Sequence, residues 1–171
     1  VASNVPFGDY SVHDPRYNKH QANIHDYFFL KSLDVVRPGG LVMHVTSTGT
    51  LDNPNSEHIR KALHEQCDFV GAVRMPNQTH KGNAGTDVVT DMVILRKRKP
   101  GVGPAGETTP TEAEPKESGF TGVTTDSLGR VYHWVNGKRV PGDHWLQTTT
   151  VPDPMGGDPI EVNQYFANNP Q

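Results

Sequence analysis

The chain has very little cysteine and no long apolar run. Cys67 is the single thiol among 171 residues, which excludes an internal disulfide and a cysteine-based zinc site. A lone cysteine fits a reducing compartment, so we expect the protein in the cytoplasm. No apolar run approaches the ~20 residues that a membrane-spanning helix needs, and no charged-then-apolar leader opens the chain. The sequence therefore predicts neither a membrane segment nor a secretory signal.

Excess positive charge is also lacking. The 16 lysines and arginines against 19 acidic residues give a net charge of −3, which excludes a globally basic nucleic-acid binder and leaves a local basic face open. One such face is the run Arg96 to Lys99, which could meet phosphates or could simply keep a strand end soluble. Apolar residues make up only 33% of the chain, so we expect part of it to remain unpacked.

The first 97 residues alternate predicted helices and strands. Asn23 is a plausible N-cap for a helix through about Val36, and Pro38 with the two glycines after it ends that helix. Asn53 followed by Pro54 predicts the start of a second helix, which runs to about residue 66. Apolar stretches predict strands at 41–46, 69–74 and 88–96. This order predicts part of an α/β sheet.

The composition changes after residue 97. Residues 98–126 are rich in Pro, Gly, Thr, Glu and Lys and predict a flexible, disordered linker. Residues 127–171 regain aromatic side chains, and Asn136-Gly137 between two apolar runs predicts a β-hairpin. We therefore predict a domain at 1–97, a linker, and a small tail segment with a hairpin.

The stretch Asn4-Val5-Pro6-Phe7 is the strongest chemical signal. The side-chain carbonyl of Asn4 and a neighbouring backbone carbonyl can accept two hydrogen bonds from one planar amine. An aromatic ring such as Phe7 can stack on the molecule that carries this amine, which is worth ~1–3 kcal/mol for a nucleobase. The alternative is a strand-to-loop turn that Pro6 stiffens and in which Phe7 packs.

Three stretches place this motif in a family. They read SNVPFGDYSVHDPRYNKH, NIHDYFFLKSLDVVRPGGL and AGTDVVTDMVILRKRK. With them the chain resembles adenine-specific, amino-methylating DNA methyltransferases, and it looks like the methylase modules of large phage and plasmid polyproteins. The ending VNQYFANNP also looks like a tail of those polyproteins. The family motif is Asn-Pro-Pro-aromatic, from which Val5 departs.

The resemblance implies a fold, a reaction and partners. The fold is the C-terminal half of a Rossmann-like, S-adenosylmethionine-dependent methyltransferase sheet. The reaction is methyl transfer to the exocyclic amine of a flipped adenine in DNA, within restriction-modification. Asn4 and the Val5 carbonyl would hold the amine, Pro6 would fix the turn, and Phe7 would stack on the base. A helicase domain in the same polyprotein is the implied protein partner.

The resemblance also marks residues that could contact the substrate. Tyr10, His13 and Tyr17 follow the motif and could touch the target strand, or they could pack on their own domain. His80 stands near the place where this family often has a second stacking residue, and a solvated loop histidine is the alternative. Thr86 belongs to the segment that leads into the last strand of the sheet.

The donor side of the chemistry is missing from these 171 residues. In this family the glycine-rich turn and the acidic residue that bind S-adenosylmethionine precede the catalytic turn, so we expect the isolated chain to be inactive. The alternative is a non-catalytic module that binds nucleic acid or protein and keeps a methyltransferase half-fold. We also expect the strand at 41–46 to lack its inner neighbour, which would leave an exposed edge open to self-association. The spacing of the histidines predicts no metal site.

Overall fold

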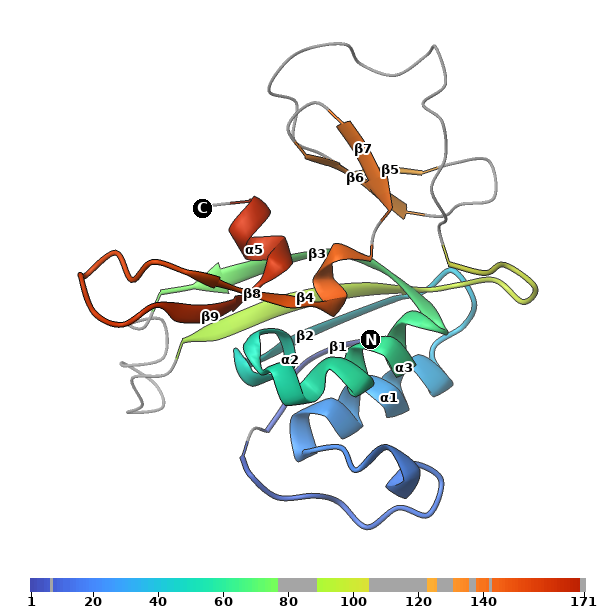
Figure 1. Ribbon diagram of the computed structural model, residues 1–171. Helices are drawn as coiled ribbons and strands as arrows, with labels where there is room; N and C mark the ends of the chain where they lie inside the picture. The colour runs from blue at the N-terminus through green and yellow to red at the C-terminus, as the bar shows by residue number, and fades with distance from the viewer. Residues whose placement is uncertain are drawn as a thin grey trace.

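A four-stranded mixed sheet forms the centre of the computed structural model (Figure 1). Its order is β1-β2-β4-β3, with β1 (Ala2–Asn4) parallel to β2 (Leu41–Ser47), and β4 (Thr90–Lys97) antiparallel to both β2 and β3 (Cys67–Met75). The predicted α/β class is confirmed. The structure describes residues 1–6, 8–76, 89–104, 123–125, 131–135, 138–141 and 143–169.

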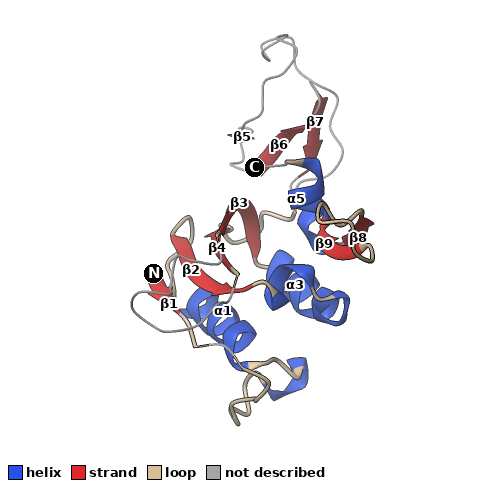
Figure 2. Cartoon of the chain, turned by 90° about the vertical axis from the view of Figure 1, so that its left-hand side faces the viewer, coloured by secondary structure: helices blue, strands red, loops and turns tan. Residues whose placement is uncertain are grey.

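Two helices cover one face of this sheet. Figures 1 and 2 show α1 (Ile24–Val35) and α3 (Glu57–His64) side by side below the strands. β2 turns Val42, His44 and Thr46 into the core beneath them, because alternate residues of a strand point to opposite faces. Short elements join these parts: η1 (Asn18–His20), α2 (Gly49–Asp52) and η2 (Pro54–Ser56). The two predicted helices and three predicted strands all exist, with ends shifted by a few residues.

The ends of the helices follow partly from the sequence. The side chain of Asn53 accepts a hydrogen bond from the Asn55 amide at 2.9 Å, as an N-cap residue should. Asn23 occupies the N-cap position of α1 without a side-chain cap bond. Gly39 has a φ of 77°, which only glycine adopts without strain, and this turn leads the chain from α1 into β2.

β2 has a strand on each side, which corrects the expectation of an open edge there. Ala2, Ser3 and Asn4 pair with Met43, His44 and Val45, and β4 pairs along the whole other side of β2. The edge strands of this sheet are therefore β1 and β3, and β2 is an inner strand. Self-association through an edge stays a prediction, now for β1 or β3.

The C-terminal segment packs into the same core. It contains η3 (His144–Leu146), β8 (Thr148–Val151), β9 (Ile160–Asn163) and α5 (Gln164–Asn168). Trp145 is fully buried and stacks on Phe69 of β3, with ring centroids 5.0 Å apart. Arg60 of α3 donates to the Leu146 carbonyl at 2.8 Å. Residues 143–169 thus pack against the four-stranded sheet and α3.

A second sheet contains β5 (Val123–Thr125), β6 (Val131–Val135) and β7 (Lys138–Pro141), all antiparallel. β6 and β7 flank the predicted turn at Asn136-Gly137, which lies outside the described residues. β5 falls inside the range predicted as linker, as does Arg98, which is buried. Residues 105–122 of that range also lie outside the described residues, so the domain boundaries stay predictions.

Candidate functional site

At the carboxyl end of β1, the first two residues of the motif, Asn4 and Val5, differ in burial. Asn4 is exposed, while Val5 is only 2% exposed and packs inside. The Val5 amide donates to the Val45 carbonyl at 3.0 Å, so the pairing of β1 with β2 continues one residue past Asn4. Val5 is thus anchored in the core, whereas the Asn4 side chain is exposed like those of Ala2 and Ser3 before it. Such a side chain is available to accept a hydrogen bond from a ligand.

The rest of the motif is only partly described. Pro6 is exposed directly after the anchored Val5. Phe7, which we expect to stack on a base, lies outside the described residues, as do His80 and Thr86. Their roles stay predictions.

The three loop residues have different surroundings. Tyr10 is 55% exposed, and its backbone carbonyl accepts from the Ile24 amide at 2.9 Å, so the backbone at Tyr10 is held beside the start of α1. His13 is exposed, and its ring lies 3.4 Å from the Asn18 amide nitrogen. Both side chains can be reached from solvent.

Tyr17 lies in the hydrophobic core. Its ring meets the Tyr27 ring edge-on at 5.4 Å, and its hydroxyl donates to Asp34 at 2.6 Å. Burial, together with this hydrogen bond, raises the pKa of Tyr17 to about 12. This placement favours the packing alternative over contact with a target strand.

A buried polar cluster lies next to the carboxyl end of β2, and no sequence motif predicts it. Thr50 donates to the Asp26 carboxylate at 3.0 Å, and the Thr46 hydroxyl lies 3.4 Å from that of Thr50. His25 approaches the other Asp26 oxygen at 3.6 Å. Burial raises the pKa of Asp26 above its usual value. These contacts tie the start of α1 to α2 and to β2, one residue beyond the Val45 that pairs with Asn4.

A second charged group lies where β3 ends and β4 begins. Arg74 makes two hydrogen bonds to Asp91, at 2.9 and 3.0 Å, and an ion pair with Asp52 of α2 at 2.7 Å. The guanidinium also lies 4.1 Å from the centre of the Phe166 ring. These contacts of Arg74 with Asp91, Asp52 and Phe166 join β3, β4, α2 and α5 at this edge of the sheet.

The described residues offer no fitting site for S-adenosylmethionine. A donor site of the implied kind needs a glycine-rich turn between a strand and a helix. The described glycines with positive φ are Gly39, Gly101 and Gly156, and none of them opens a helix. We therefore derive no step through this cofactor.

Within the described part of the chain there is also no group of three or more potential metal ligands. None of the helices described is long and apolar enough to cross a membrane.

Comparison with known proteins gives one sequence relative. No family model matches the chain. The chain is 32% identical over 99 residues to the defense against restriction protein B of Escherichia phage P1. This match covers 57% of the chain and 4% of the phage protein, so the chain spans a small fraction of that relative.

Two solved structures share part of the fold. A chain of a type I R-M system superposes with a TM-score of 0.48 and 23% identity, covering 56% of this chain and 20% of that one. A protein from Listeria monocytogenes, assigned to the class I S-adenosylmethionine-dependent methyltransferases, gives a TM-score of 0.47 and 18% identity, covering 62% and 33%.

Proposed function

We propose that the chain is the base-binding part of an adenine-specific DNA methyltransferase. In this proposal Asn4 and the Val5 carbonyl accept hydrogen bonds from the exocyclic amine of an adenine turned out of the duplex. Phe7 stacks on that base and offsets part of a flipping cost of a few kcal/mol. The DNA that carries the target adenine is the partner.

The placement of Asn4 supports this proposal. Its side chain is exposed at the carboxyl end of a strand, which is the edge where open α/β sheets bind their ligands. Val5 is buried and its amide is bonded to Val45, so the backbone at this point is fixed by the core. The burial of Val5 also explains how a residue other than proline can hold the turn. Packing replaces the restriction that a proline ring would give.

The base-binding role is tested by titration of a single-stranded oligonucleotide that contains one adenine. Loss of one hydrogen bond costs about 1 kcal/mol, so we expect Asn4→Ala to bind about fivefold more weakly than the wild type. Asn55→Ala is the matched control, because Asn55 is an exposed asparagine on η2. Equal affinity of wild type and Asn4→Ala would remove the role assigned to Asn4.

The donor is tested separately by calorimetry. In the proposal the residues that hold S-adenosylmethionine lie outside this 171-residue chain, so we expect no tight, saturable binding of the cofactor. Tight binding would show that these residues contain a donor site after all. A methylation assay on the same chain is expected to give no methylated DNA.

One observation favours a second candidate function. The sequence relative is named for defense against restriction, so a non-catalytic module that binds nucleic acid or protein remains the alternative. Val5 in place of the first proline of the motif fits such a module. The two candidates differ in the oligonucleotide titration, because only the methyltransferase role requires Asn4 to recognise a base.

A further inference from the structure

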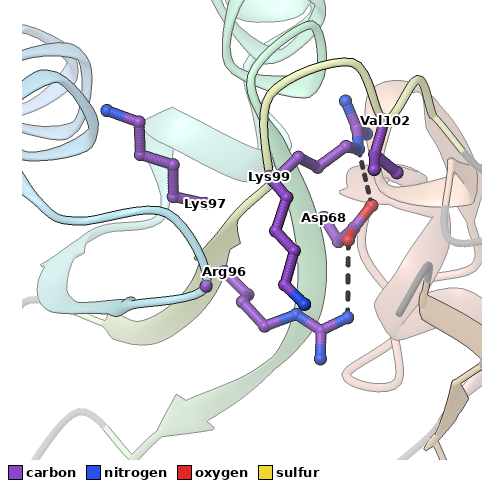
Figure 3. Close-up of a pocket in the computed structure, with 7 residues that line it drawn as sticks. Asp68, Arg96, Lys97, Lys99 and Val102 are labelled. Carbon is purple, nitrogen blue, oxygen red and sulfur yellow. Dashed lines mark hydrogen bonds and ion pairs between the residues drawn. The ribbon is translucent and has the colours of Figure 1, made fainter. Parts of the chain in front are cut away.

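A small cavity with a strongly basic lining lies at the opposite end of the sheet from Asn4. Its volume is about 250 Å³, and it forms where β4 ends and β2 and β3 begin (Figure 3). Asn4 pairs with Val45, whereas the cavity lies by Arg96, which pairs with Leu41. Four residues of strand separate these positions, about 13 Å at 3.3 Å per residue. The lining residues are Gly39, Asp68, Arg96, Lys97, Arg98, Lys99 and Val102.

The lining carries more positive charge than its carboxylate can balance. Four consecutive cations, Arg96 to Lys99, face one anion, Asp68, so the lining has a formal excess of four minus one, or three, positive charges. The Asp68 carboxylate forms two ion pairs, with Arg98 at 2.7 Å and with Arg96 at 3.5 Å. One carboxylate thus serves two guanidinium groups.

Arg98 is the unusual member of this group. Its side chain is only 3% exposed, and its Nε and Nη1 donate to Asp68 and to the His64 carbonyl. Its Nη2 is buried and has no hydrogen-bond partner among the residues that the structure describes. A buried charge that is incompletely paired is costly, and it acts on its surroundings more strongly than a solvated one.

The fold holds the cations at the rim in different ways. Lys97 donates to the carbonyls of Leu33 and Asp34 at the C-terminal end of α1, so its ammonium group is already bound. Gly101, at a φ of 78°, turns the chain so that the Val102 amide bonds to the Lys99 carbonyl. This turn keeps exposed Lys99 at the same cavity as Arg96, as Figure 3 shows.

We propose that this cavity binds a phosphate-type oxyanion. Arg96 and Lys99 would donate to its oxygens, and the buried Arg98 would add its field from behind. Guanidinium and ammonium groups are the preferred protein partners of phosphate. A cavity of this volume is below the range of drug-sized ligand pockets, which fits one small anion or one phosphate group of a nucleic-acid backbone. The site stands apart from the function proposed for Asn4, and neither depends on the other.

The experiment is a titration of the ¹⁵N-labelled chain with inorganic phosphate at constant ionic strength, with chloride as the reference salt. We expect saturable shifts of the amide signals of Gly39, residues 97–99, Gly101 and Val102. Lys99→Gln should weaken the binding at least about tenfold, since it removes a charge-assisted hydrogen bond, and Lys99→Arg should keep it. Lys19→Gln, an exposed lysine on η1, is the matched control, and Asn4→Ala should bind phosphate like the wild type.

The proposal is overturned if phosphate causes no saturable shift at these amides, or if Lys99→Gln binds it as well as the wild type does. A short duplex titrated over a range of salt concentrations then identifies the source of the phosphate. If the site takes a backbone phosphate, Lys99→Gln lowers the slope of log affinity against log salt by about 0.9. An unchanged slope together with retained phosphate shifts assigns the site to a free anion.

Discussion

Replacement of Asn163 by alanine should destabilise the whole domain, although this residue is only eight positions from residue 171. Asn163 is fully buried, and its amide group donates to the carbonyls of Leu51 at 2.9 Å and Trp145 at 2.8 Å. Its side-chain oxygen accepts from the Tyr165 amide at 3.0 Å and so caps α5. One side chain therefore joins α2, η3 and α5.

The expected cost follows from these three hydrogen bonds. At about 1 kcal/mol each, Asn163→Ala should lower the free energy of unfolding by about 3 kcal/mol. With an m-value of about 2 kcal/mol/M, this moves the urea midpoint down by about 1.5 M. Asn55→Ala, in which the lost side chain is exposed, should leave the free energy of unfolding within about 0.5 kcal/mol of the wild type.

Urea unfolding is followed by two signals. Trp145 fluorescence, in a Trp134→Phe background, reports on the C-terminal segment, and far-ultraviolet circular dichroism reports on α1 and α3. We expect the two signals to change together in every variant, because Trp145 and Phe69 share one core. Separate transitions, or equal midpoints for Asn163→Ala and Asn55→Ala, would refute the inclusion of the C-terminal segment in the domain.

Three further predictions concern the buried His133 and the two tyrosines Tyr17 and Tyr10. Burial lowers the pKa of His133 from 6.5 to about 4. The stability that depends on a neutral His133 is therefore present above pH 6.5 and is lost as the pH falls towards 4. In urea unfolding, the wild type should lose about 2 kcal/mol between pH 7 and pH 5 relative to His133→Gln. A constant difference between the two proteins at both pH values would contradict that placement of His133. Tyr17→Phe should cost about 1 kcal/mol of stability through loss of the bond to Asp34 and leave oligonucleotide affinity unchanged. Tyr10→Ala, in contrast, should weaken oligonucleotide binding and leave stability nearly unchanged, and the reverse pattern in the same two assays would assign base contact to Tyr17.

The sequence predicts the local elements well, because their signals are local. The helix after Asn23, the turn at Gly39 and the helix after Asn53 depend on residues a few positions apart. Strands β2, β3 and β4 are apolar runs that the same kind of pattern predicts.

The contacts that the sequence does not predict are all long-range. Nothing in the residues around Trp145 indicates that it stacks on Phe69, 76 positions earlier, or that Asn163 reaches Leu51. The position of β4 between β2 and β3 is likewise a matter of pairing across the chain. Arg98 lies in a stretch with the composition of a linker, and its contacts with Asp68 and the His64 carbonyl make it part of the domain.

The polar cluster around Asp26 is only weakly indicated in the amino-acid sequence. An acidic residue in the first turn of a helix is common on solvated surfaces, so its sequence position alone does not indicate burial. Burial follows only once Thr46 and Thr50 are brought against it by β2 and α2. Such a cluster becomes visible when the fold is known.

The central claim is that Asn4 recognises the exocyclic amine of adenine, and a cycle of four affinities tests it most directly. Wild type and Asn4→Ala are each titrated with an oligonucleotide that carries one adenine and with the same oligonucleotide carrying purine, which lacks the amine. We predict that the wild type prefers adenine about thirtyfold, from two hydrogen bonds of about 1 kcal/mol each, and that Asn4→Ala keeps only about a fivefold preference, because the Val5 carbonyl is then the one remaining acceptor. The same preference in both proteins would contradict the claim.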